Sequence, residues 1–246
     1  MASIKDSLEE TVQDVNATLK FLIFAIPLFY TILLATSSRQ PSFYPYLLTV
    51  TILLMFGFML KCTYNLRRGE PRILPGFNVF DIVFTGLKGA IALAPLIIVA
   101  VLVATTLNGI LSKILNAEAH KITTYVVNVI CASFAATGYL LYAKSFKIFD
   151  AYNVGQITKH CADVILAVFF MFLQLAIIDT LLVAPVTYVI WLFFGLPHPV
   201  ALFFWCMIGV LNFAMSGHYL AQVDYEIIEL NKDEILDAEL KFANKK

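Results

Sequence analysis

The sequence predicts an all-α integral membrane helical bundle with about six transmembrane helices and short interfacial helices. Hydrophobic residues make up 60% of the 246 residues, and charged residues make up only 14%. The apolar residues gather into runs of about 20 residues, which is the length at which a helix crosses a bilayer. A bilayer offers the backbone no water to bond with, so these uninterrupted runs are expected to be helical.

Basic residues mark the ends of the apolar runs. Four spans are expected between the pairs Lys20 and Arg39, Arg39 and Lys61, Lys88 and Lys113, and Lys121 and Lys144. A fifth and a sixth span are expected within 162–223, on either side of the turn-like segment 195–199. The chain is therefore divided into a cytoplasmic amphipathic helix (1–19), a six-helix membrane domain (20–223) and a cytoplasmic tail helix (224–246).

The fifth span is longer than a bilayer requires. As one helix, 162–194 would measure about 50 Å, against a hydrocarbon core of roughly 30 Å. Pro185 removes a backbone hydrogen bond and clashes with the preceding turn, so we expect a kink or a break near it. The piece 186–194 would then lie along the membrane interface or form a re-entrant half-helix.

The distribution of basic residues predicts the orientation. With six spans, 14 lysines and arginines lie on one side of the membrane and 3 on the other, whereas seven spans would divide them 10 to 7. Cytoplasmic loops carry the excess of basic residues, so we expect six spans in the cell membrane with both termini in the cytoplasm. The 17 basic and 17 acidic residues cancel, and nothing indicates a nucleic-acid partner.

Both ends of the chain are expected to form amphipathic helices. At the amino end Ser3 is placed to cap a helix, and an apolar stripe follows at spacings of three and four: Ile4, Leu8, Val12, Val15 and Leu19. The opposite face is acidic, which disfavours binding to anionic lipid. The stripe packs on the protein's own loops in one interpretation and docks a partner protein in the other.

A polar stripe indicates a short interfacial helix before the third span. Its members fall three or four residues apart: Asn78, Asp81, Thr85 and Lys88. This pattern is typical of a helix half sunk in the cytoplasmic interface. The phrase FNVFDI in this helix returns as YNVGQI 75 residues later. The similarity is either a weak parallel repeat of helix, interfacial segment and helix, or a chance likeness of two amphipathic loops.

The two loops carry a resemblance to a family. LPGFNVFDIVFTGLKG at 74–89 and YAKSFKIFDAYNVGQI at 142–157, set between apolar helices, resemble the prokaryotic membrane proteins called domain of unknown function 4013. The likeness covers about 47–223. It implies a bacterial or archaeal multi-pass membrane protein and brings no established activity, catalytic residue or cofactor.

Asp179 is the main candidate for a functional side chain, because an intramembrane carboxylate is costly. It is either an interfacial or structurally paired residue or a polar site inside the bundle. The four cysteines are expected to be small core residues, and the four histidines to be structural or solvated. No HExxH, GxSxG, Walker or GxGxxG motif is present in the sequence, so we expect no enzyme, metal or cofactor.

Two functions remain open. The expected one is a non-enzymatic accessory or scaffold subunit of a membrane complex, which binds a protein partner or self-associates through its cytoplasmic helices. The other is a small transporter or lipid-handling protein, indicated by the repeat, by Asp179 and by the proline in the fifth span. In both cases the lipid bilayer is a partner.

Overall fold

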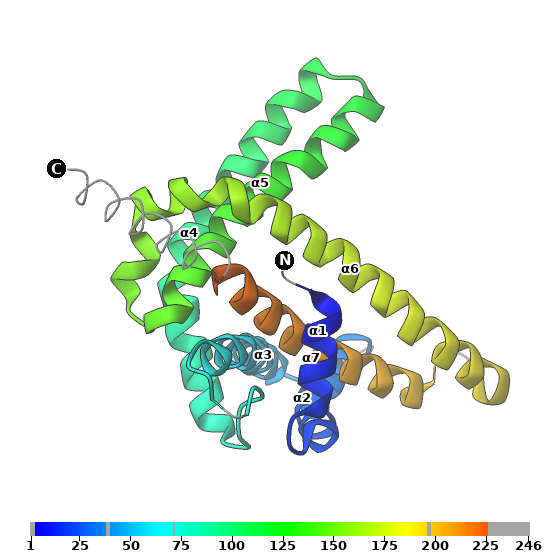
Figure 1. The fold of residues 1–246 in the computed structure, drawn as a ribbon. Coiled ribbons are helices and arrows are strands. Elements are labelled where there is room, and N and C mark those ends of the chain that lie inside the picture. The colour runs from blue at the N-terminus through cyan, green and yellow to red at the C-terminus, as the bar shows by residue number, and fades with distance from the viewer. Residues whose placement is uncertain (1–2, 38–39, 71, 196–197, 226–246) are drawn as a thin grey trace. The chain divides into compact units, whose positions relative to one another are not determined.

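Six long apolar helices dominate the chain (Figure 1). The computed structural model describes residues 3–37, 40–70, 72–195 and 198–225. The elements are α1 (Ile4–Gln13), α2 (Ala17–Ala35), α3 (Tyr44–Arg67), α4 (Val79–Ile114), α5 (Ala117–Ser145), the 3-10 helix η1 (Ile148–Tyr152), α6 (Val154–Phe194) and α7 (Pro199–Asp224). Helices α2 to α7 are each long and apolar enough to cross a membrane. The predicted fold class is confirmed. The predicted tail helix lies mostly in 226–246, outside the described residues.

The helices form two compact units, and α4, α6 and α7 each contribute to both. The α3 unit consists of 3–90 and 171–219. It holds α1, α2, α3, the start of α4, the second part of α6 and most of α7. The α5 unit consists of 91–170 together with the described residues 220–225. It holds the remainder of α4, α5, η1 and the first part of α6.

Glycines let the helices of the α3 unit approach closely. A Cβ atom on Gly57 of α3 would overlap the carbonyl group of Ile82 in α4, and one on Gly86 of α4 would overlap that of Leu53. Gly217 of α7 lies in the same way against the carbonyl oxygen of Met59. Membrane helices associate by packing and not by excluding water, and small residues permit the closest contact.

In the α5 unit a short 3-10 helix folds back on α5. Helix α5 ends at Ser145, its C-cap residue Phe146 has a left-handed φ of 54°, and η1 begins two residues later. The Tyr152 hydroxyl donates a hydrogen bond of 2.6 Å to the carbonyl oxygen of Ala92 in α4. This bond ties the loop after α5 to the part of α4 in the same unit.

Pro185 does not break α6, so of the expected kink or break the break is wrong. Helix α6 is continuous over 41 residues, which is about 60 Å. The piece 186–194 belongs to it and is not a separate re-entrant or interfacial segment. Membrane helices tolerate proline where neighbouring groups satisfy the freed carbonyl, and water does not compete for the remaining backbone bonds.

The predicted interfacial helix is not a separate element. Residues 79–88 form the first turns of α4. Asn78 precedes this helix, and its Oδ1 accepts a hydrogen bond of 3.3 Å from the backbone N–H of Asp81, as an N-cap does. Asn153 caps α6 in the same way, accepting 3.2 Å from the N–H of Gln156. The two capping asparagines are 75 residues apart, and so are the first residues of α4 and α6. This is the offset at which the sequence repeat is predicted.

Helix α1 is shorter than predicted and buries a different face. Ser3 caps it as expected, accepting a hydrogen bond of 3.3 Å from the N–H of Asp6. The helix ends at Gln13, and Asn16 has a left-handed φ of 60°, so the predicted stripe is interrupted.

The apolar stripe of α1 is only partly buried. Ile4 is buried, but Val12, Val15 and Leu19 are about half exposed, whereas the polar residues Ser7 and Thr11 are buried. Of the two interpretations of the stripe, packing on the protein holds for Ile4 and is wrong for Val12, Val15 and Leu19. Ser7 contacts His218 of α7 and Asp14 contacts Lys20 of α2, so the polar face turns inward.

We predict that Gly57→Ala lowers the unfolding free energy by about 1–3 kcal/mol, because a methyl group forces α3 and α4 apart. Gly109→Ala is the matched control, since it lies in the same class of helix with no atom within 4 Å of an added Cβ. It should be neutral or stabilising, because alanine favours helix over glycine. Thermal unfolding of the full chain in mild detergent measures both, and equal stability of the two variants would contradict the glycine contact.

Candidate functional site

Asp179 on α6 is paired with Asn212 on α7. The Asn212 amide nitrogen Nδ2 lies 2.9 Å from both carboxylate oxygens. A carboxylate only accepts hydrogen bonds, so the amide must turn its nitrogen toward it. The partner is neutral, and no basic side chain pairs with Asp179 among the described residues. The structure thus gives Asp179 a neutral hydrogen-bond partner that contributes no positive charge.

The pair lies at one end of a groove between α6 and α7, within the α3 unit. The groove has a volume of ≈ 730 Å³. Ligand sites for small molecules generally measure roughly 300–1,000 Å³, so the groove is large enough for one. At the other end the Trp205 indole N–H donates a hydrogen bond of 2.8 Å to the Thr187 hydroxyl. Two polar contacts thus join the helices, one at each end of the groove.

Helical spacing places the lining residues on one face of each helix. Those of α6 follow one another at intervals of one and three: Asp179, Thr180, Val183, Ala184, Thr187, Tyr188 and Trp191. Those of α7 are Trp205, Ile208, Gly209 and Asn212. Residues three and four apart share a face of a helix, so the two rows form the opposing walls. Both tryptophans of the chain belong to the groove.

Sequence reasoning identified Asp179 but missed Asn212 and the aromatic end of the groove. The row of polar and aromatic residues along one face of α6 was a signal that could have indicated a lined groove. Asn212 is uncharged and stands alone in an apolar helix, so nothing in the sequence assigns it to Asp179, 33 residues away.

A second cavity lies between α4 and α5 within the α5 unit. Its volume is ≈ 230 Å³, below the usual range for a ligand site. Its described lining is apolar apart from Cys131 and includes Leu96, Val127 and Phe134. The larger groove, which holds a charge, is the better candidate. All four cysteines are buried, as expected of core residues.

The residues of the predicted polar stripe have local roles. Asp81 forms an ion pair with Lys61 of α3, so it links the start of α4 to a neighbouring helix. The Thr85 hydroxyl donates 2.7 Å to the carbonyl oxygen of Asp81 within the same helix. The Lys88 ammonium lies 4.5 Å from the centre of the Phe84 ring. These residues do not converge with Asp179 in the groove lining.

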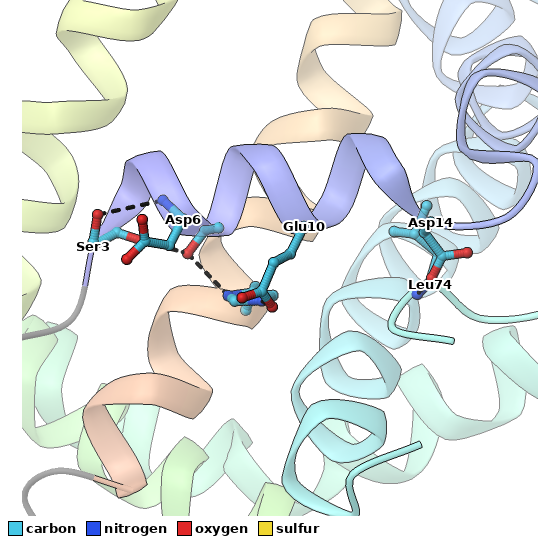
Figure 2. Close-up of polar contacts among 7 residues, drawn as sticks. Ser3, Asp6, Glu10, Asp14 and Leu74 are labelled. Carbon is cyan, nitrogen blue, oxygen red and sulfur yellow. Dashed lines mark hydrogen bonds and ion pairs between the residues drawn. The ribbon is translucent and has the colours of Figure 1, made fainter. Parts of the chain in front are cut away.

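A buried ion pair holds the end of α1 in the α3 unit. Figure 2 shows Asp14 just beyond α1, beside Leu74 in the loop before α4. The Lys20 ammonium lies 3.0 Å from Oδ1 of Asp14, and the two side chains are 4% and 1% exposed. Oδ2 of Asp14 accepts 2.8 Å from the N–H of Leu74, and Lys20 donates 3.2 Å to the carbonyl oxygen of Leu74. Both charges thus have partners, as burial requires.

A histidine of α7 holds the middle of α1. Nε2 of His218 lies 2.8 Å from a carboxylate oxygen of Glu10, and Nδ1 lies 3.0 Å from the Ser7 hydroxyl. Ser7 donates its proton to the carbonyl oxygen of Ser3, so its oxygen is an acceptor for the ring. Both ring nitrogens of His218 thus have a polar partner on α1. Of the four histidines, His218 is therefore structural, as expected.

No protein-family model, curated protein or solved structure matches the chain. The resemblance to the family called domain of unknown function 4013 stays a prediction.

We predict that Lys20→Met lowers the unfolding free energy by about 3–5 kcal/mol, because Asp14 is left as an unpaired buried charge. Lys61→Met is the matched control. Its partner Asp81 is half exposed, so its loss should cost no more than about 1 kcal/mol. Denaturant unfolding of the full chain in detergent, followed by circular dichroism, measures the difference. Similar losses in both variants would show that the Asp14 network does not hold α1.

Proposed function

We propose that this membrane protein is a small transporter or lipid-handling protein that holds a largely apolar molecule in the groove between α6 and α7. The observation that carries the proposal is a groove of ≈ 730 Å³ that contains an acidic side chain and lies between two helices of membrane-spanning character. Most of its lining is apolar or aromatic, with few polar groups, which is the usual composition of a small-molecule site.

The placement of Asp179 supports a binding role. A carboxylate near the centre of a membrane helix costs about 2.5–3.5 kcal/mol on insertion scales, so such residues are rare and usually functional. A purely structural link between α6 and α7 needs no charge. At the other end of the groove, the hydrogen bond of Trp205 with Thr187 joins the same two helices through neutral groups.

The orientation belongs to the same proposal. We propose that both termini lie in the cytoplasm, supported by 14 lysines and arginines on that side of a six-span chain against 3 on the other. We also propose that the protein lies in the cell membrane. Tags on the two ends that are labelled from opposite faces of the membrane would contradict this orientation.

A second candidate function is that of an accessory subunit, and the exposed face of α1 favours it. The contacts with His218 and Lys20 fix α1 on one side. The other side exposes the acidic residues Asp6 and Glu9. An anchored helix with an acidic face is suited to a basic surface of a partner protein, because charge complementarity selects partners.

We predict that Ala184→Phe displaces the bound molecule, because the ring fills the groove that Ala184 lines. Ala176→Phe is the matched control, an exposed position of the same helix that does not line the groove. Native mass spectrometry of the protein released from its own membrane should show a bound amphiphile in the wild type and in Ala176→Phe, but not in Ala184→Phe. Equal occupancy in all three proteins would overturn the proposed function.

For the accessory role, we predict that Asp6→Asn with Glu9→Gln reduces recovery of a cross-linked protein partner from native membranes. Both side chains are exposed, and Glu10 is kept because it contacts His218. Glu118→Gln, which neutralises an exposed acid at the start of α5, is the control and should leave recovery unchanged. Unchanged recovery in the double variant would remove the support for this role.

A further inference from the structure

The Asp179 end of the groove offers hydrogen-bond acceptors and a negative charge. The donor of Asn212 is already used by the carboxylate, and the Thr180 hydroxyl donates 2.8 Å to the carbonyl oxygen of Ala176. A carboxylate has about four lone-pair sites, and Asn212 uses only part of them. The Asn212 oxygen Oδ1 is buried and has no hydrogen-bond partner in the part of the chain that the structure describes. A ligand group that completes this end must therefore donate hydrogen bonds.

The charge decides which donor suits the site. A neutral hydroxyl would satisfy a lone pair but would leave the carboxylate charge uncompensated in apolar surroundings. A cationic donor satisfies both, because it donates hydrogen bonds to the free lone pairs and its positive charge attracts the carboxylate more strongly in apolar surroundings than in water. No lysine, arginine or histidine is among the described residues that line the groove. The compensating cation must then come with the ligand.

The opposite end of the groove suits an apolar body. Asp179 and Trp191 are 12 residues apart on α6, which corresponds to about 18 Å. Between them the lining includes Val183 and Ala184, and the far end holds Tyr188 and Trp191, whose rings lie 5.8 Å apart. The groove therefore changes along its length from an anionic end to an aromatic end.

We propose that the groove binds an organic ammonium with an apolar body. The ammonium group donates hydrogen bonds to Asp179, and the body lies along Val183 and Ala184 toward the aromatic end. This inference rests on the proposed function, since it names the chemical class of the molecule held in the same groove.

The two tryptophans allow ligand binding in the groove to be measured by fluorescence. Trp191 and Trp205 are the only tryptophans of the sequence and both line it, so tryptophan emission of the full chain reports on this site. We would titrate octylammonium, octanol and octanoate into the protein in phosphatidylcholine nanodiscs. These probes share a chain and differ in the polar end. The expected result is a saturable response to octylammonium at a concentration about tenfold lower than to octanol, with octanoate weaker still.

Two variants assign the preference to Asp179. Asp179→Asn should bring the responses to octylammonium and octanol together, because the charge is lost while the size of the side chain is kept. Asp163→Asn makes the same change on the same helix outside the groove and should keep the preference. Ala184→Phe should suppress the response to octylammonium by filling the groove. A preference that persists in Asp179→Asn would overturn the proposal.

The outcomes also separate this inference from the proposed function. Equal saturable responses to octylammonium and octanol in the wild type would overturn the ammonium preference. They would still support the proposed function, in which the groove holds an amphiphile. The same response to sodium chloride alone would assign the site to an inorganic cation and would also overturn the preference. The absence of a saturable response to any of the three probes would overturn both proposals.

Discussion

The bilayer interior supplies no hydrogen-bond partner, so each polar group of an apolar helix must find one within the chain. Several polar side chains of the long helices meet this constraint in one of two ways. Thr105 and Thr137 bond back to carbonyl oxygens four residues earlier in their own helices. Other polar side chains bond across to a neighbouring helix, as Thr31 does with Thr51 at 2.9 Å. The pair of Asp179 and Asn212 belongs to this second group, and its acceptor is a carboxylate.

The same constraint acts differently where the chain has charged partners at the ends of its helices. There the polar face of α1, and not its apolar stripe, turns inward. The buried charges of Asp14 and Lys20 satisfy each other and both backbone groups of Leu74. Once these contacts form, Val12 and Val15 are left at the surface.

The sequence predicted the features that depend on local pattern. Apolar runs and their basic ends indicated all six long helices, and Ser3 was identified as the cap of α1. Features that depend on distant partners could not be predicted. The buried face of α1 is set by His218 and Lys20, which the periodicity of α1 does not contain. The continuity of α6 at Pro185 and the partner of Asp179 likewise depend on the packing of helices far apart in the sequence.

The central claim is that Asp179 and Asn212 form a direct contact that joins α6 to α7 at the end of the groove. A double-mutant cycle of Asp179→Ala and Asn212→Ala, measured by unfolding of the full chain in nanodiscs, tests it most directly. We expect the two losses not to be additive, with a coupling free energy of about 1–3 kcal/mol. Additive losses would show that the two side chains do not interact.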